Sequence, residues 1–130
     1  MESNYLGLLG LSRRAGKLQS GSEASREAIS GGEAKLIIIA NDASERTREN
    51  FEFFAEEAGV SVITVAESAE QLGNAIGKRP CAVIAICDVG FSAAIVKKLE
   101  GINDSAKAVS EKLISKATRA SFRKKQRRTK

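Results

Sequence analysis

The residues whose types and spacing best suit ligand binding are Ser20-Gly21-Ser22-Glu23, which fit a capping box at the start of a helix. In such a box the Ser20 hydroxyl accepts a hydrogen bond from the Glu23 backbone N–H, while the Glu23 side chain reaches back. The first backbone N–H groups of a helix have no partner within it, and beside a flexible glycine they can receive a phosphate or a base edge. Gly21, Ser22 and Glu23 are therefore the first candidate binding residues.

The sequence does not favour catalysis. Asp42 and Asp88 follow expected strands, where α/β proteins commonly place ligand-binding groups, but both are well explained as turn or capping residues. The chain has no histidine, which excludes an imidazole base and a histidine-based zinc site. Cys81 and Cys87 are about 20 Å apart along an expected strand, too far for a disulfide, and we interpret them as small core residues. We expect a protein that is not an enzyme and needs no metal or cofactor.

The net charge of +5 is divided unevenly along the chain. Residues 116–130 carry eight Lys and Arg and no acid, whereas the other 115 residues hold 13 basic and 16 acidic side chains. The basic pI therefore belongs to this tail, while the body of the protein is acidic. The candidate anion-binding residues of the tail are Arg123, Lys124, Lys125, Arg127 and Arg128.

Hydrophobic periodicity and capping signals predict alternating helices and strands. Helices are expected at about 3–14, 20–30, 45–58, 68–76 and 92–99, and strands at 36–40, 60–65 and 81–87. The strand at 36–40 reads Leu-Ile-Ile-Ile-Ala, a continuous apolar run typical of a strand buried on both faces. This order indicates an α/β protein, a three-layer α/β/α sandwich around a short sheet.

Helical spacing also predicts which side chains face the core. The first helix should have a broad apolar face, made by Tyr5, Leu8, Leu9 and Leu11. In the helix at 45–58, the side chains that should face the sheet are Phe51, Phe54, Ala55 and Ala58. Phe53 lies on another face and is expected to be exposed. Arg13, Arg14 and Lys17 cluster at the end of the first helix, where they suit the helix dipole and a bound ligand about equally.

Beyond Gly101 the pattern changes, which separates a domain at 1–100 from a basic C-terminal extension at 101–130. A thin apolar stripe at helical spacing would allow the extension to pack on the body, to pair with a partner, or to order on binding; it comprises Ile102, Ala106, Val109, Leu113, Ala117 and Ala120. The terminal SFRKKQRRTK is expected to be disordered in isolation, because like charges repel and little can be buried.

No apolar run is long enough to cross a membrane. At the N-terminus, Glu2 comes early and Arg13-Arg14 follow the apolar run, which is the wrong order for a secretory signal. We therefore expect a cytoplasmic protein with no membrane partner.

Several stretches together resemble a known family. AGKLQSGSEASREAISGGEAKLIIIANDAS, followed by SAEQLGNAIGK and CAVIAICDVGF, is similar to the kink-turn RNA-binding ribosomal-protein superfamily, which includes the large-subunit proteins seven-Ae and thirty-e. The likeness is greatest to the small bacterial YlxQ-type proteins and spans roughly residues 5–98. The resemblance implies an α/β/α sandwich with a four-stranded mixed sheet. It also implies a function in binding RNA.

The resemblance further implies where RNA would be contacted. In the family, a loop and a helix N-terminus read the sheared G·A pairs of a kink-turn, and the matching positions here begin at Gly21, Ser22 and Glu23. Other contacts near the same edge are implied for Lys17, Lys35 and Asn41, and in the loop before the last strand for Lys78 and Arg79. Three positions depart from the family pattern: Glu23 replaces a donor, Ala24 an acceptor and Glu27 a phosphate-pairing cation.

Two hypotheses follow for function. The first is a non-catalytic RNA-binding protein, ribosome-associated or bound to structured, kink-turn-like RNA, whose basic tail adds electrostatic affinity. Its partners would be RNA and ribosomal proteins, and nothing in the sequence demands more than a monomer. The second is a protein-interaction module on the same fold, in which Glu23 and Glu27 face a basic partner and the stripe from Ile102 to Ala120 docks in a groove.

Overall fold

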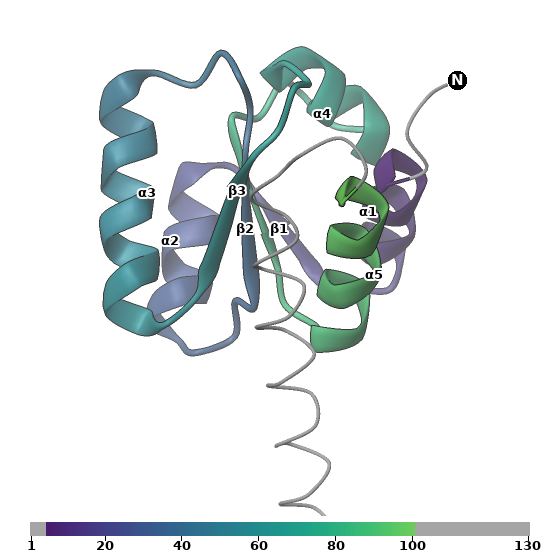
Figure 1. Ribbon diagram of the computed structural model, residues 1–130. Coiled ribbons are helices and arrows are strands. Elements are labelled where there is room, and N and C mark those ends of the chain that lie inside the picture. The colour runs from purple at the N-terminus through teal and green to yellow at the C-terminus, as the bar shows by residue number, and fades with distance from the viewer. Residues whose placement is uncertain (1–4, 101–130) are drawn as a thin grey trace, which may run out of the picture.

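The computed structural model describes residues 5–100, in which helices and strands alternate as the sequence predicts (Figure 1). The helices are α1 (Tyr5–Arg14), α2 (Ser22–Ser30), α3 (Glu45–Ala58), α4 (Ala69–Ile76) and α5 (Val89–Leu99). The strands are β1 (Leu18–Ser20), β2 (Leu36–Ile39), β3 (Ser61–Thr64) and β4 (Val83–Ile86). The expected amphipathic stripe and basic tail lie outside the described residues.

The four strands form one mixed sheet in the order β1-β4-β2-β3. β2 and β3 are parallel, whereas β4 runs antiparallel to both of its neighbours. Helices α1, α4 and α5 cover one face of the sheet, and α2 and α3 cover the other (Figure 1). The predicted α/β/α sandwich with a four-stranded mixed sheet is therefore confirmed.

The apolar strands β2 and β4 form the centre of both cores. Along β2, Leu36 and Ile38 contribute to the core under α1, α4 and α5, while Ile37 and Ile39 contribute to the core under α2 and α3. This division follows from the alternation of side chains along a strand. Because helices cover both faces, every residue of β2 is fully buried, which explains its unbroken apolar sequence.

The short strand β1 lies where sequence patterning predicted only a connector. It has three residues, and its middle residue Gln19 is exposed, so it carries no run from which a period of two could be detected. Its existence depends on antiparallel pairing with β4, in which Leu18 lies opposite Ile86 and Ser20 opposite Ile84. Only the family resemblance had implied a fourth strand.

The buried face of α1 only partly coincides with its apolar face. Tyr5, Leu9 and Ser12 are fully buried, whereas Leu11 is 49% exposed. Positions 5, 9 and 12 share one side of a helix. The buried Ser12 hydroxyl has a hydrogen-bond partner there, because it donates to the Leu8 carbonyl at 2.7 Å. Leu11 thus belongs to the apolar face of the helix without being buried, and the small Ser12 is buried in its place.

The helices α3 and α4 begin as their sequences predict. The Ser44 side chain accepts from the Thr47 backbone N–H at 3.1 Å, and Ser68 and Gln71 form a capping box, as the sequence Ser-Ala-Glu-Gln at 68–71 predicts. In α3, Phe51 and Ala55 are buried and Phe54 is partly buried, but Ala58 is exposed, contrary to prediction. Phe53 is 60% exposed, as expected. Within residues 5–100, no helix combines the length and the apolar character that membrane crossing requires.

Tyr5 links α1 to the segment between β3 and α4, because its hydroxyl donates a hydrogen bond to the Glu67 carboxylate. Burial raises the pKa of Tyr5 well above its usual range, and the neighbouring Glu67 carboxylate raises it further. The folded state therefore binds this proton more tightly than the unfolded state does.

We expect the free energy of unfolding to lose a Tyr5 contribution above about pH 10, by up to about 1.4 kcal/mol per pH unit, because only the unfolded chain then releases the proton. Below that pH the contribution is constant. Urea denaturation at several alkaline pH values measures it, and Tyr5→Phe should be flatter over the same range. Because Tyr5 is the single tyrosine, its ultraviolet titration reports the same proton. An identical pH dependence in both proteins would contradict the assignment.

Candidate nucleic-acid interface

The register of β4 separates the sequence-predicted binding residues into two groups. At one end of the sheet, the Cys87 N–H donates to the Lys17 carbonyl and the Lys35 N–H donates to the Ile86 carbonyl, both at 2.7 Å. At the other end, the Gly21 N–H donates to the Val83 carbonyl at 2.9 Å. The three-residue step from Ile86 to Val83 is about 10 Å along the strand.

Lys17 and Lys35 therefore lie at the opposite end of the sheet from Gly21, and the expectation that all three share one edge is wrong. The order of strands and their register, which decide this, are not encoded in any local pattern around the lysines. Both lysines lie near Cys87 instead. Burial raises the pKa of the Cys87 thiol, Glu33 raises it further, and the two lysine charges partly oppose this shift.

The end of the sheet that holds Gly21 carries a hollow of about 520 Å³, which we call the cationic hollow. It is lined by Arg13, Ser20, Gly21, Gly77, Lys78, Arg79, Pro80 and Cys81. These residues come from the end of α1, the β1–α2 turn and the loop between α4 and β4. Among the described residues that line it, three are cations and none is a carboxylate. Such a surface favours an anion.

The turn at Gly21 leaves the start of α2 without a side-chain cap. Gly21 is the N-cap residue, with φ of +94°, a conformation that glycine adopts readily. The predicted capping box is wrong, because Ser20 pairs with Ile84 as the last residue of β1 and does not cap the helix. Sheet pairing has overridden the local pattern. The first N–H groups of α2 thus receive no hydrogen bond acceptor from the N-cap residue.

The Lys78–Arg79 loop is held in place by the helix before it. Gly77 ends α4 with φ of +71°, and the Lys78 N–H donates to the Gly73 carbonyl at 2.9 Å. The Cys81 N–H donates to the Ala69 carbonyl at 3.1 Å. Both ends of the loop are therefore bonded to α4. Cys81 is buried, and this burial raises the pKa of its thiol.

Gly73 lets the loop lie directly against α4. A Cβ atom at position 73 would contact the carbonyl oxygen of Arg79 and would lie 2.7 Å from its carbonyl carbon and 2.9 Å from the Cα atom of Pro80. Both partners are backbone, so neither can move aside cheaply. Arg13 lies at the same end of α4, since its guanidinium is 3.7 Å from where a Gly77 Cβ would be.

Asn41 lies at the same end of the sheet but is not among the residues lining the hollow. Its side-chain amide donates to the Ala66 carbonyl at 2.6 Å, and its backbone N–H donates to the Glu67 carbonyl at 2.9 Å. The next residue, Asp42, accepts from the Ala69 N–H at 2.8 Å. These contacts brace the loop after β2 against the start of α4. Asp88 likewise caps α5 by accepting from the Phe91 N–H at 2.8 Å.

Ser22 and Glu23 face a different part of the surface. They line a hollow of about 330 Å³ between α2 and α3, together with Arg26, Thr47, Asn50, Phe51 and Phe54. Glu23 is therefore not among the residues that line the cationic hollow, although it is two positions from Gly21. Glu27 is exposed on α2. The candidate tail residues Arg123, Lys124, Lys125, Arg127 and Arg128 lie outside the described residues.

The structure adds residues that the sequence reasoning left out or left open. The sequence left open whether Arg13 serves the helix dipole or a ligand, and the structure places it among the residues that line the cationic hollow. For Gly73, the sequence offered only the observation that a glycine lies inside a predicted helix. Such a glycine often has a packing role. Across residues 5–100, no cluster of three His, Cys, Asp or Glu could hold a metal ion.

We expect Gly73→Ala to displace the Lys78–Arg79 loop and to lower the free energy of unfolding by about 1–3 kcal/mol, the usual range for overpacking. Gly7→Ala is the matched control, since a Cβ there meets nothing within 4 Å and alanine is the better helix former. That control should raise stability by up to about 1 kcal/mol. Urea denaturation and the amide chemical shifts of Lys78, Arg79 and Cys81 measure both effects. Unchanged shifts at 78–81 in Gly73→Ala would refute the contact.

Comparisons with known proteins agree with this fold. A model of the "Ribosomal protein L7Ae/L30e/S12e/Gadd45 family" matches residues 3–96. The large ribosomal subunit protein eL30 of Tetrahymena thermophila is 34% identical over 92 residues, which are 70% of this chain and 88% of that protein. The RNA-binding protein YlxQ of Enterococcus faecium is 35% identical over 96 residues, covering 74% of this chain and 91% of its own length.

A solved structure, that of a 15.5kD RNA binding protein from Giardia lamblia, superimposes with a TM-score of 0.63 at 25% sequence identity. The match covers 74% of this chain and 84% of that one. The residues that the family model matches include every helix and strand from α1 to β4 and most of α5. The chain therefore belongs to the ribosomal protein L7Ae/L30e/S12e/Gadd45 family.

Proposed function

We propose that residues 1–100 form a non-catalytic RNA-binding domain that docks structured, kink-turn-like RNA in the cationic hollow. The observation that carries this proposal is the convergence of Arg13, Gly21 and the Lys78–Arg79 loop, from three distant parts of the chain, on one hollow without a lining carboxylate among the described residues. Relatives named as an RNA-binding protein and as a ribosomal protein support the choice of RNA as the anion.

The three elements of the hollow suit different parts of a nucleotide. Arg13 and Lys78 supply charge for phosphates, which provide most of the affinity of such complexes. Arg79 has a planar guanidinium that can stack on an unpaired base. Beside the hollow, the uncapped N–H groups at the start of α2, from Ser22 onward, are further donors for a phosphate oxygen or a base edge.

The acidic residues that depart from the family pattern do not oppose this mode of binding. Glu23 lines the hollow between α2 and α3, and the cationic hollow is lined by other residues. A phosphate held by Lys78 and Arg79 would therefore not have to approach the Glu23 carboxylate. The departures from the family pattern would instead reduce the range of RNA structures that the domain recognises. The side chains of Glu23, Ala24 and Glu27 cannot supply the donor, the acceptor and the cation of that pattern.

Other parts of the proposal rest on the tail and on the family. Residues 101–130 form a basic extension that adds sequence-independent affinity through contacts with phosphates. The ribosomal relatives support ribosomal RNA and ribosomal proteins as partners in the cytoplasm. Nothing in the described residues requires more than a monomer.

A second candidate function is a protein-interaction module. The observation that favours it is the α2–α3 side, where Glu23 lies in a hollow and Phe53 is exposed. Under this alternative, RNA binding would come from the tail alone and would not depend on the Lys78–Arg79 loop.

We expect the full-length double variant Lys78→Gln/Arg79→Gln to bind a kink-turn RNA about 10- to 100-fold more weakly than the wild type and to lose its preference over a plain duplex of equal length. The reason is the loss of two charge-assisted contacts, each worth on the order of 1 kcal/mol. Mobility-shift titrations measure both quantities. Lys97→Gln/Lys98→Gln on α5 is the control of equal charge, and it should keep the preference. Equal weakening by the two variants would argue for non-specific attraction.

We also expect neutralising the tail to flatten the salt dependence of RNA binding. For the wild type, log K should fall with log salt with a slope of about −3 to −5, since only part of the eight tail cations meets phosphate. Changing Arg123, Lys124, Lys125, Arg127 and Arg128 to Gln should bring this slope closer to zero by at least about 2. Titrations at several salt concentrations measure it. An unchanged slope would remove the tail from the proposal.

A further inference from the structure

The acidic charge of the body is concentrated in one layer of the sandwich. Helices α2 and α3 together carry seven glutamates and three arginines, a net charge of −4. The remaining described residues carry a net charge of +2. The chain thus has an acidic α2–α3 layer, whereas its segment 116–130 carries +8.

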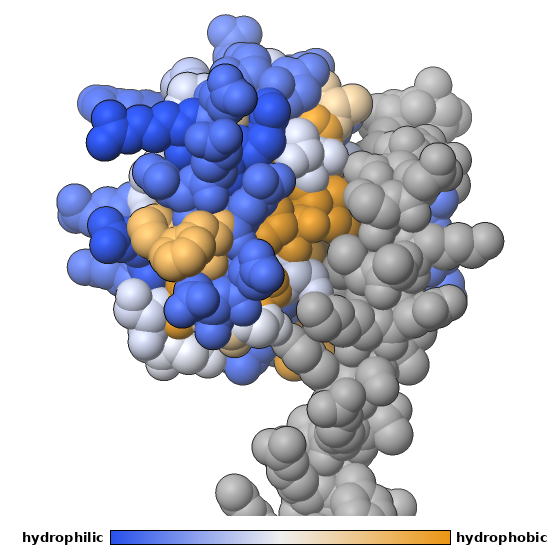
Figure 2. All heavy atoms as spheres, turned by 60° about the vertical axis from the view of Figure 1, so that its left-hand side comes forward, coloured by the Kyte–Doolittle hydropathy of each residue, from blue (hydrophilic) through white to orange (hydrophobic). Residues whose placement is uncertain are grey.

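Between these two helices runs a groove that the RNA proposal does not use. Two adjoining hollows of about 370 and 330 Å³ share Arg26 and Phe54, and we call them together the α2–α3 groove. It begins at Ser22 and Glu23 and continues to Phe53 and Glu57 on α3. Figure 2 turns the α2–α3 side of the molecule forward, and apolar surface there is surrounded by hydrophilic residues.

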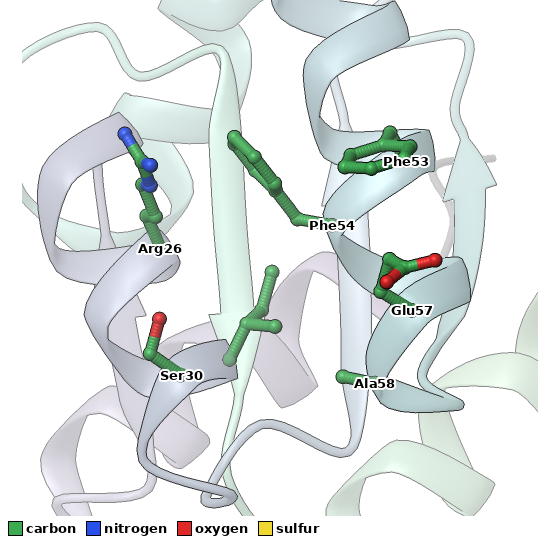
Figure 3. Close-up of a pocket in the computed structure, with 7 residues that line it drawn as sticks. Arg26, Ser30, Phe53, Phe54, Glu57 and Ala58 are labelled. Atoms are coloured by element: carbon green, nitrogen blue, oxygen red, sulfur yellow. The ribbon is translucent and has the colours of Figure 1, made fainter.

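The aromatic side chains of the groove differ in how far they are covered. Phe54 extends from α3 into the space between the helices, where the Arg26 guanidinium lies 4.6 Å from its ring centroid (Figure 3). Phe53 lies beside it, with ring centroids 6.0 Å apart, but is 60% exposed. Glu57 lies one turn further along α3 (Figure 3). The groove therefore offers an open aromatic ring next to a carboxylate.

We propose that the α2–α3 groove docks the chain's own basic segment, residues 116–130. Phe122 of this segment packs against Phe53 and Phe54, and the cations that follow it lie against the glutamates of α2 and α3. Aromatic pairs prefer such edge or offset contacts, and opposite charges around them favour the docked orientation. The segment supplies both parts, since Phe122 is followed directly by Arg123, Lys124 and Lys125.

The length of the chain allows this contact. Phe122 lies 22 positions after Glu100. This stretch can span up to about 70 Å when extended, whereas a domain of this size has a radius of gyration of only about 12 Å. Tethering also sets an effective concentration near the millimolar range, so that even a weak attraction populates the docked state. This advantage over a free partner is the reason to prefer the chain's own segment as the occupant.

If the tail docks on the α2–α3 layer, two anionic surfaces compete for its cations: this layer and the phosphates of RNA. The cations that meet the α2–α3 layer in the free protein are those that would meet RNA phosphates in a complex. The proposal concerns the free chain and does not depend on whether the cationic hollow binds RNA. It predicts attraction that weakens as salt screens the charges.

The test uses isotope-labelled full-length protein without RNA. Amide chemical shifts of the wild type are compared with those of the tail variant in which Arg123, Lys124, Lys125, Arg127 and Arg128 are changed to Gln, and with those of Phe122→Ala. We expect the differences within residues 5–100 to cluster on α2 and α3, and we expect salt at about 0.5 M to move the wild-type signals towards those of the tail variant. Differences clustered on α1, α4 or α5, or none within 5–100, would overturn the proposal.

Paired substitutions distinguish a specific contact in the groove from a general attraction between opposite charges. Phe53→Ser should abolish most of the tail-dependent shifts, whereas Leu11→Ser, at the other exposed large apolar side chain among the described residues, should retain them. Glu57→Gln should reduce them more than Glu70→Gln, which removes an exposed carboxylate from α4. If the shifts disappear on dilution, the contact joins two chains and the intramolecular proposal is wrong. Equal effects of Phe53→Ser and Leu11→Ser would also contradict it.

Discussion

The antiparallel placement of β4 between β1 and β2 is the constraint on which the rest of the structure depends. Because β4 pairs with both neighbours, the turn that follows β1 and the loop that precedes β4 meet at one end of the sheet. The hydrogen bond from Gly21 to Val83 fixes that meeting point. A fully buried strand of four residues thus decides which polar groups can act on the same ligand.

Features of the fold that depend on neighbouring residues could be predicted from the sequence, whereas features that depend on contacts between distant residues could not. The strand Leu36–Ile39 and the cap at Ser68 were predictable, because an apolar run and a capping box are local signals. The capping box at Ser20 was wrong because a long-range pairing with Ile84 competes for the same residue. Strand β1 was too short to show a period, and helical spacing alone could not show that Ser12 is buried in place of Leu11.

The candidate site shows the same division. Gly21, Lys78 and Arg79 were singled out from sequence and do lie together, although their contact with RNA stays a prediction. Lys17 and Lys35 were assigned to the same edge, but strand register carries them to the other end of the sheet. The roles of Arg13 and Gly73 depend on how α1 and α4 pack at the hollow, which no spacing along the chain reveals.

The close approach of Gly73 to the backbone of Arg79 has a thermodynamic consequence for binding. A loop that is bonded to its helix at both ends and packed against it between them has already lost much of its conformational entropy during folding. A ligand that enters the hollow would then pay little to order the protein and would meet a surface that is already in its bound shape. Association at this surface should therefore resemble the docking of two preformed bodies, with a small heat-capacity change for its size and no coupled folding of the loop.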